Sequence, residues 1–159
     1  MSNKRMGRAL AIAALIAFGG TTAARAQVKL ETTSFVESFV AARDGTMERQ
    51  LKPTTIVVPG DRLVYVITYR NSGRQPASDF VITNPIASTV EFIGDETAGA
   101  EMSIDGGKTF GPLVGLRVRN SDGTTRAARR SDVTHLRWRL PGAIAPGASG
   151  QVSFKARLK

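Results

Sequence analysis

The sequence contains no cysteine, which excludes both a disulfide framework and a thiolate metal site. It has a single histidine, His135, and a single tryptophan, Trp138. It has no G-x-S-x-G elbow, and neither a second histidine nor a cysteine is present to act as a base. We therefore predict a protein that is not an enzyme and that binds no cofactor.

Long hydrophobic runs are also missing. The apolar run at residues 10–18 is shorter than the roughly 20 residues that a membrane-spanning helix needs. It follows three cationic residues and precedes a small-x-small sequence that ends at Ala26, a pattern typical of a secretory signal peptide. We predict that residues 1–26 are cleaved. The mature chain is then exported to the periplasm, the medium or the cell surface, with no transmembrane anchor.

Acidic residues are scarce in the last part of the chain. Residues 117–159 hold 10 Lys or Arg but only two acids, whereas residues 27–116 hold 8 Lys or Arg and 11 Asp or Glu. The predicted leader carries four cations and no acid, so its removal lowers the net charge from +9 to +5. Such an exported protein meets acidic polysaccharide, lipopolysaccharide phosphate or anionic lipid, and we predict no nucleic acid partner.

The chain does contain a series of short segments typical of β-strands. RLVYVITY at 62–69 is rich in β-branched and aromatic residues and has turn sequences on both sides, PGD before it and NSG after it. Both of its faces are apolar, which predicts a central strand. Further strands are predicted at 80–83, 89–93, 101–104, 115–119, 134–140 and 151–158.

These strands, with regular turn signals and no long helical period, predict an antiparallel β-sandwich in one domain. Residues 27–56 form its N-terminal strand segment and residues 57–159 its core. Residues 31–50 are ambiguous, because their apolar residues fit one helical face while VKLETTSF also alternates as a strand; we favour the strand. Residues 120–132 are polar and basic, which predicts a long exposed loop.

Four segments carry strands and turn signals in a recognisable order. They are VVPGDRLVYVITYRNSG at 57–73, FVITNPI at 80–86, TVEFIGDE at 89–96 and LRWRLPGAIAPGASGQVSFKARL at 136–158. Together they resemble the DUF11 repeat domain of bacterial surface and secreted proteins. The resemblance implies an all-β, immunoglobulin-like antiparallel β-sandwich of about 7–9 strands without a defined catalytic activity. This chain differs from the usual pattern in its Asn84, its long 105–132 region and its single copy.

One short motif, SIDGGKTF at 103–110, resembles the Asp box of sialidase-type propellers. It raises the hypothesis of a glycan-active protein. A propeller needs several blades of about 40 residues each, however, and this chain carries one copy of the motif. We therefore predict a structural hairpin in which Asp105 caps the turn, Gly106 or Gly107 has a positive φ and Phe110 covers the sandwich end.

Three other candidate sites are weaker. Alternation along THLRWRL at 134–140 predicts Trp138 in the core, where it could not stack on a sugar. The same alternation places His135 on the outer face among cations, which disfavour a metal. NSDG at 120–123 is suggestive of a calcium loop but lacks the alternating acids and the distal Glu. We predict no metal site.

The alternation also predicts a basic sheet face on two strands. Arg137 and Arg139 point away from the core in one strand, and Lys155, Arg157 and Lys159 do so in the last strand. We expect these two strands to pair, with Arg126, Arg129 and Arg130 of the loop extending the face. Because like charges on neighbouring strands repel, this predicts an anionic partner or interleaved acids from a third strand, unless the face is simply solvated.

These features favour an exported, non-enzymatic interaction module of the cell envelope that contacts an anionic surface through the basic face. The partner is an envelope component or protein, such as an acidic polysaccharide or lipid. A second hypothesis is a fibre or assembly subunit in which residues 28–40 add a strand to a neighbouring copy. A glycan-active protein is the third.

Overall fold

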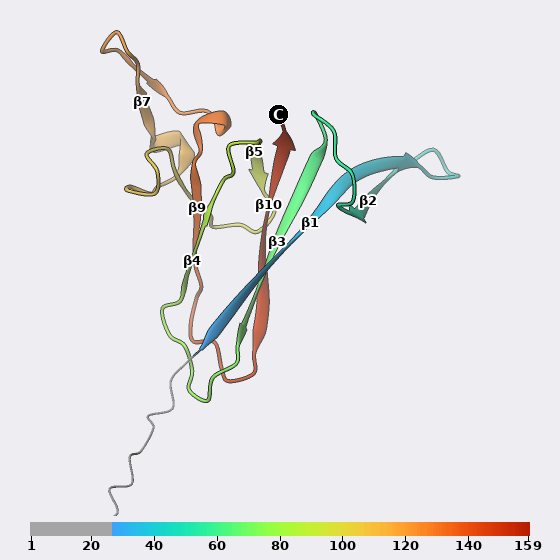
Figure 1. Ribbon diagram of the computed structural model, residues 1–159, viewed down its shortest axis with the longest axis vertical. Helices are drawn as coiled ribbons and strands as arrows, with labels where there is room; N and C mark the ends of the chain where they lie inside the picture. Colours follow the sequence, from blue (N-terminus) through green and yellow to red (C-terminus); the bar gives the residue numbers. More distant parts are fainter. Residues whose placement is uncertain (1–26) are drawn as a thin grey trace, which may run out of the picture.

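The computed structural model describes residues 27–159, and the predicted signal peptide lies outside the described residues. The regular secondary structure of the described chain is nearly all β-strand, arranged in a five-stranded sheet, a three-stranded sheet and a two-stranded ribbon (Figure 1). Its elements are β1 (Val28–Ala41), β2 (Met47–Pro53), β3 (Arg62–Asn71), β4 (Val81–Pro85), β5 (Val90–Asp95), β6 (Glu101–Ser103), η1 (Leu113–Gly115), β7 (Arg117–Arg119), β8 (Thr125–Ala127), η2 (Arg130–Asp132), β9 (His135–Arg139) and β10 (Ser149–Leu158). The all-β sandwich prediction is confirmed.

The five-stranded sheet has the order β2-β1-β3-β10-β5, and every neighbouring pair is antiparallel. The predicted central strand, β3, lies in its middle and buries residues of both parities, such as Leu63 and Val64. The ambiguous segment forms β1, a turn and β2, so the strand interpretation is confirmed and the helical one is wrong. β1 pairs with β3 from Val28 to Glu37 and with β2 from Phe35 onward.

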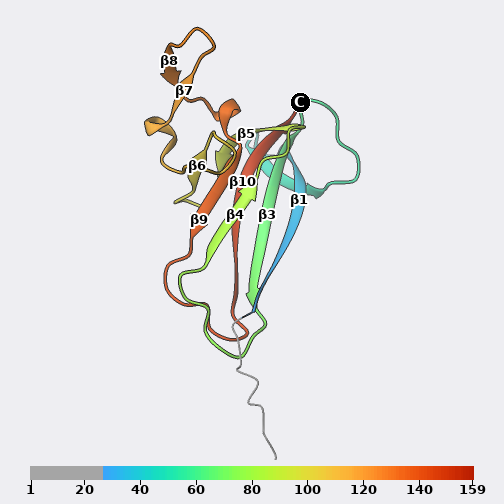
Figure 2. The same cartoon turned by 60° about the vertical axis from the view of Figure 1, so that its left-hand side comes forward.

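The three-stranded sheet has the order β4-β9-β6 and covers the inner face of the larger sheet (Figure 2). Trp138 is buried between the two layers, which confirms its predicted place in the core. Tyr65 and Phe154 stack with their ring centroids 4.9 Å apart. The buried side chains of this core are Leu63, Ile67, Ile82, Val90, Phe92, Met102, Val133, Leu136, Trp138, Val152, Phe154 and Ala156.

The predicted pairing of the 134–140 strand with the last strand is wrong. β9 pairs with β4 and β6, whereas β10 pairs with β3 and β5. The reason lies in their apolar residues: Trp138 of β9 and Phe154 of β10 have ring centroids 6.4 Å apart across the core. The two strands therefore lie in opposite layers, and their outer faces point in opposite directions.

The predicted loop at 120–132 is only partly a loop. β7 and β8 form a small antiparallel ribbon closed by a turn in which Asn120 and Thr124 are hydrogen-bonded, and η2 follows. Asp122 accepts hydrogen bonds from the main chain and the hydroxyl of Thr124, at 2.9 and 2.6 Å. The suggested calcium loop is thus a β-turn whose carboxylate is held by its own backbone.

Candidate functional site

The Asp-box segment forms a hairpin turn, as predicted. Met102 and Gly111 exchange two main-chain hydrogen bonds at its base. Asp105 accepts hydrogen bonds from the Ser103 hydroxyl at 2.7 Å, the Thr109 hydroxyl at 2.6 Å and the main chain of residues 108 and 109. The hydrogen bonds from Thr109, with that from Ser103, hold the pKa of Asp105 well below its ordinary range.

Both candidate glycines of this turn have a positive φ, 77° at Gly106 and 85° at Gly107. Gly107 also lies against the imidazole of His135, where an added Cβ would come within 3.3 Å of the ring. His135 is on the outer side of β9, as predicted, but the turn half buries it. Its Nδ1 lies 3.2 Å from the hydroxyl of Thr134.

The predicted basic face is not one surface, because its cations lie on two opposite layers. Arg137 and Arg139 are on the three-stranded sheet, and both contact Glu101 of β6, at 2.7 and 3.4 Å. Arg137 also lies over the ring of Phe110, 4.1 Å from its centroid. The interleaved acid that sequence analysis considered as an alternative is present here.

The other predicted cations are on the five-stranded sheet. Lys155 pairs with Glu96 at 3.0 Å and with Glu37 at 3.4 Å. Arg157 lies opposite Glu91 of β5, and Lys159 donates a hydrogen bond to the Ser88 carbonyl. These contacts distribute the positive charge among acids and the main chain, so the proposed anionic-contact face has no structural basis as a continuous patch.

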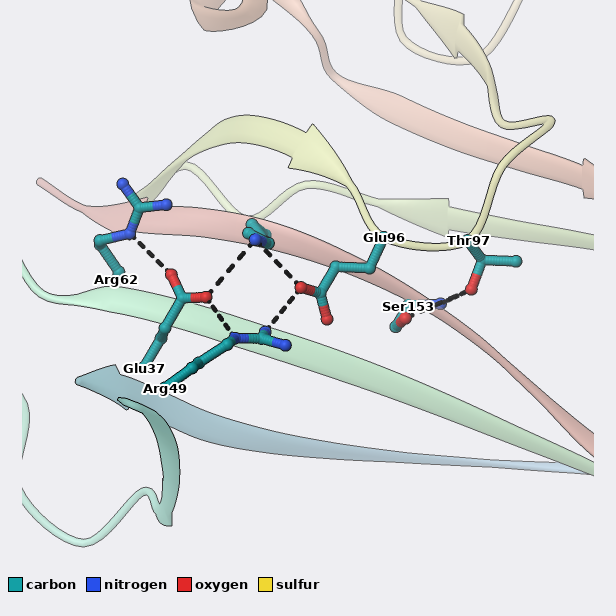
Figure 3. Close-up of polar contacts among 7 residues, drawn as sticks. Glu37, Arg49, Arg62, Glu96, Thr97 and Ser153 are labelled. Carbon is teal, nitrogen blue, oxygen red and sulfur yellow. Dashed lines mark hydrogen bonds and ion pairs between the residues drawn. The ribbon is translucent and has the colours of Figure 1, made fainter. Parts of the chain in front are cut away.

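Lys155 belongs to a network that we call the ionic ladder. It consists of one residue from each of four strands and one that directly follows the fifth: Glu37 of β1, Arg49 of β2, Arg62 of β3, Lys155 of β10 and Glu96 after β5 (Figure 3). Glu37 binds Arg49 at 2.6 Å and Arg62 at 2.7 Å, and Glu96 binds Arg49 at 2.6 Å. The ladder thus crosses the whole sheet.

The side chain of Glu37 has no exposed surface, while those of Arg49 and Arg62 are 37% and 43% exposed. Burial raises the pKa of Glu37, but hydrogen bonds from Arg62 and Arg49 and the charge of Lys155 outweigh it, and the pKa is lowered overall. Glu37 is therefore ionised although its side chain is buried.

The segment after β5 holds Glu96 at the end of the ladder. The main-chain N–H groups of Glu96 and Thr97 both donate to the Ser153 carbonyl at 3.1 Å. In return, Ser153 donates its N–H to the Thr97 hydroxyl at 2.9 Å (Figure 3). Trp138 adds a hydrogen bond from its indole N–H to the Thr97 carbonyl, at 3.3 Å. This segment is tied both to β10 and to the core.

The ionic ladder was not predicted from the sequence. The one available signal is Glu37 itself, which shares a strand face with Phe35 and Phe39 if β1 is read as a strand. An acid between two large apolar residues indicates a buried or paired carboxylate. Its partners come from three other strands, and a single sequence gives no register for those pairings.

A second charged region projects from the sandwich at the end that carries β7 and β8 (Figures 1 and 2). We call residues 104–132 the basic arm. Its acids are all engaged within the arm: Asp105 and Asp122 cap turns, and Asp132 binds Arg126 at 2.6 and 2.7 Å. The hydrogen bond from Arg126 is the main cause that lowers the pKa of Asp132 to about 2.

The cations of the basic arm are mostly without acidic partners. Arg126 is the only one of them that forms an ion pair within residues 27–159. Arg117 donates to the carbonyls of Val114 and Leu116, at 2.9 and 3.1 Å, which orients its guanidinium without neutralising it. The remaining cations are Lys108, Arg119, Arg129 and Arg130, all of them exposed.

A cleft of about 410 Å³ lies between the Asp-box hairpin and β7. This volume is within the range of small-ligand sites in proteins. Two arginines supply donors beside apolar side chains, whereas the Thr109 hydroxyl of the lining already donates to Asp105. The cleft is lined by Ile104, Asp105, Thr109, Gly115, Leu116, Arg117, Val118 and Arg119, all from the basic arm.

No group of three or more His, Asp or Glu side chains within residues 27–159 is placed to hold a metal ion. Within the same residues, no helix is long and apolar enough to cross a membrane.

Comparison of this chain with protein-family models, curated proteins and solved structures gives no match. The resemblance to the DUF11 repeat domain therefore stays a prediction.

Proposed function

We propose that this protein is an exported, non-enzymatic contact module of the cell envelope whose basic arm binds an anionic envelope component. The observation that carries the proposal is the local excess of unpaired cations. Arg117, Arg119, Arg129 and Arg130 have no ion pair in the described part of the chain, and the acids of the same arm are all engaged.

The sandwich body differs from the arm. It also has unpaired cations, such as Arg70 and Arg157, but these are interspersed with acids that are equally free, such as Glu31 and Glu91. Opposite charges that lie within about one Debye length of each other, about 8 Å at physiological salt, largely cancel each other's potential. The arm is the region where positive potential accumulates.

The chemistry of the arm suits phosphate or carboxylate groups. A guanidinium offers donors in a planar fork that matches both anions and binds them through paired hydrogen bonds. Arg117 and Arg119 are two residues apart in β7, so their side chains lie on the same face of the strand. Both line the cleft, so one anionic group could engage both. Their shared position favours a ligand with repeated or multivalent negative charge.

An enzymatic role for the Asp-box motif has little support. Asp105 uses both carboxylate oxygens as acceptors in its turn, and its pKa is lowered by those hydrogen bonds. A general acid needs a raised pKa, and a nucleophile needs a free oxygen. Asp105 therefore acts as a turn cap in our proposal, with no role in glycan cleavage.

The fibre-subunit hypothesis requires residues 28–40 to leave their own domain. In the structure these residues pair with β3 and β2 of the same chain over most of their length. Glu37 of this segment is also fixed by the ionic ladder. We therefore prefer the contact module.

The test is co-sedimentation of the protein with isolated cell envelopes across a salt series from about 20 to about 500 mM. One variant changes Arg117, Arg119, Arg129 and Arg130 to Ser. We expect the unmodified protein to bind at low salt and to dissociate as the salt rises, and the arm variant to lose most of this binding.

A matched control removes the same net charge elsewhere, by changing Arg43, Arg70, Arg74 and Arg157 to Ser. These four residues are exposed and form no ion pair within residues 27–159. The control variant should keep most of the binding. An equal loss in both variants, or no binding of the unmodified protein at low salt, contradicts the proposal.

A further inference from the structure

The larger sheet ends in β2, whose outer edge has no partner strand within residues 27–159. β2 pairs with β1 on one side only. An open edge presents unpaired N–H and C=O groups, which form a template for another strand.

The turn before β2 indicates which main-chain groups of β2 point outward. Ala42 donates its N–H to the Thr46 carbonyl at 2.7 Å, so this pair is hydrogen-bonded. Hydrogen-bonded and non-bonded pairs alternate in an antiparallel ladder, so Ser38 with Gln50 is also a hydrogen-bonded pair. By this alternation the main-chain groups point towards β1 at Glu48, Gln50 and Lys52, and outward at Met47, Arg49, Leu51 and Pro53.

Two independent observations agree with this assignment. Pro53, which has no N–H, falls in the outward set, where a proline on an edge strand removes no ladder bond. At the other end of β1, Ser72 donates its N–H to the Gln27 carbonyl, so Gln27 and Ser72 form a hydrogen-bonded pair. Because hydrogen-bonded and non-bonded pairs alternate along the β1–β3 ladder, the main-chain groups of Ser38 point away from β3 and towards β2.

The same edge carries exposed apolar side chains. Phe39, Met47 and Leu51 are 49%, 61% and 41% exposed. The β1–β2 register places them on one face of the ribbon, because Leu51 lies opposite Glu37 and Phe39 opposite Arg49. Large apolar residues grouped beside an open edge favour a protein partner over solvent.

We propose that two copies of this protein pair through their β2 edges, antiparallel about a twofold axis at Gln50, so that two five-stranded sheets join into one. In this register Arg49 of each copy faces Leu51 of the other. Both residues have outward main-chain groups, so each such pair exchanges two hydrogen bonds. This inference does not depend on the basic arm or on the proposed function.

Charge complementarity supports this register. β2 has the sequence MERQLKP, and pairing about Gln50 places Glu48 of one copy opposite Lys52 of the second copy, a pair that the twofold axis repeats. Both side chains are exposed, and neither forms an ion pair within the described residues of one chain. The second copy thus supplies each of them with an opposite charge.

The remaining cation of the edge does not oppose this pairing. Arg49 is already bound to Glu37 and Glu96 in its own chain, at 2.6 Å each. Its charge is therefore compensated before the second copy arrives. On the same face, Met47 meets Pro53 of the second copy, which covers apolar surface that the monomer exposes.

The test is analytical ultracentrifugation of the protein, produced from its full sequence, up to about 1 mM. The variants are Glu48→Lys, Lys52→Glu and the double exchange Glu48→Lys/Lys52→Glu. Each single change places like charges opposite one another twice and should weaken dimerisation about 10- to 30-fold. The double exchange restores both opposite-charge pairs and should restore the dimer, and a mixture of the two single variants should form mixed dimers.

Folding and register are checked separately. All variants should keep the thermal unfolding of the monomer, because both positions are exposed. Amide exchange should show that the N–H groups of Met47, Arg49 and Leu51 become protected as concentration rises. A monomer throughout, a dimer that tolerates both single changes, or protection that arises instead at Leu30 and Thr32 of β1 would overturn the proposal.

Discussion

The ionic ladder and the basic arm are both rich in arginine and lysine, yet they use positive charge in opposite ways. In the ladder, three cations surround two carboxylates, one of them fully buried. In the arm, the carboxylates are taken up by turns and by Arg126, and the other cations face solvent. The comparison teaches that the net charge of a segment does not reveal its potential, since strands distant in sequence decide which charges are neutralised.

The largest expected effect comes from removing the buried charge of the ladder. We predict that Glu37→Gln lowers the free energy of unfolding by about 2 kcal/mol, because three cations lose their central carboxylate. The effect stays below that of a fully buried ion pair, since Arg49 and Arg62 are partly hydrated. Urea unfolding measures it.

The control is Glu31→Gln, on the same face of the same strand but exposed. It should change the free energy of unfolding by less than about 0.5 kcal/mol. Similar losses in the two variants would show that the ladder gives no special stability.

The second prediction concerns acidity. Because the pKa of Glu37 is lower in the folded protein, this residue stabilises the fold above its unfolded pKa of about 4.3, and the contribution is lost as the pH falls through the folded pKa. The unmodified protein should therefore lose more free energy of unfolding between pH 6 and pH 3 than Glu37→Gln does. Parallel pH profiles would contradict the assignment.

The third prediction concerns Glu101, whose removal leaves two cations without their carboxylate partner. Glu101→Gln releases Arg137 and Arg139 from their carboxylate, and Arg137 lies against Phe110 of the Asp-box hairpin. If unpaired cations near the arm bind the envelope, this variant should bind about two- to threefold more tightly at low salt. Glu91→Gln makes the same charge change on the opposite layer, and an equal gain there would indicate a response to net charge alone.

The smallest effect on the free energy of unfolding is expected from removing the unpaired arginines of the basic arm. Changing Arg117, Arg119, Arg129 and Arg130 to Ser should alter the free energy of unfolding by less than about 1 kcal/mol, because exposed unpaired side chains contribute little. The same four changes should abolish most envelope binding. A loss as large as that of Glu37→Gln would assign these arginines a structural role.

Much of the fold could be predicted because its signals are local. The apolar alternation of THLRWRL placed Trp138 in the core, and the turn residues around RLVYVITY bounded the central strand. The Asp-box turn was also predictable, since Ser103, Asp105 and Thr109 satisfy each other within eight residues.

The candidate site was harder to predict because it depends on which strands become neighbours. Assigning the strands of Arg137 and Lys155 to one sheet gave a basic face that the structure divides between two layers. The acids Glu101 and Glu37, which compensate these cations, come from strands 36 and more than 100 residues away. Local alternation gives the face of a residue within its strand but says nothing of the neighbouring strand.

The order β2-β1-β3-β10-β5 has a consequence for how the chain is made. Its last strand, β10, fills the place between β3 and β5 and supplies Val152, Phe154 and Ala156 to the core. Until β10 has been synthesised, β3 has an open side and β5 has no neighbour in its sheet. The strands that precede β10 therefore cannot complete this sheet or its core by themselves, so folding of the sandwich depends on a strand that is far from β3 in the sequence.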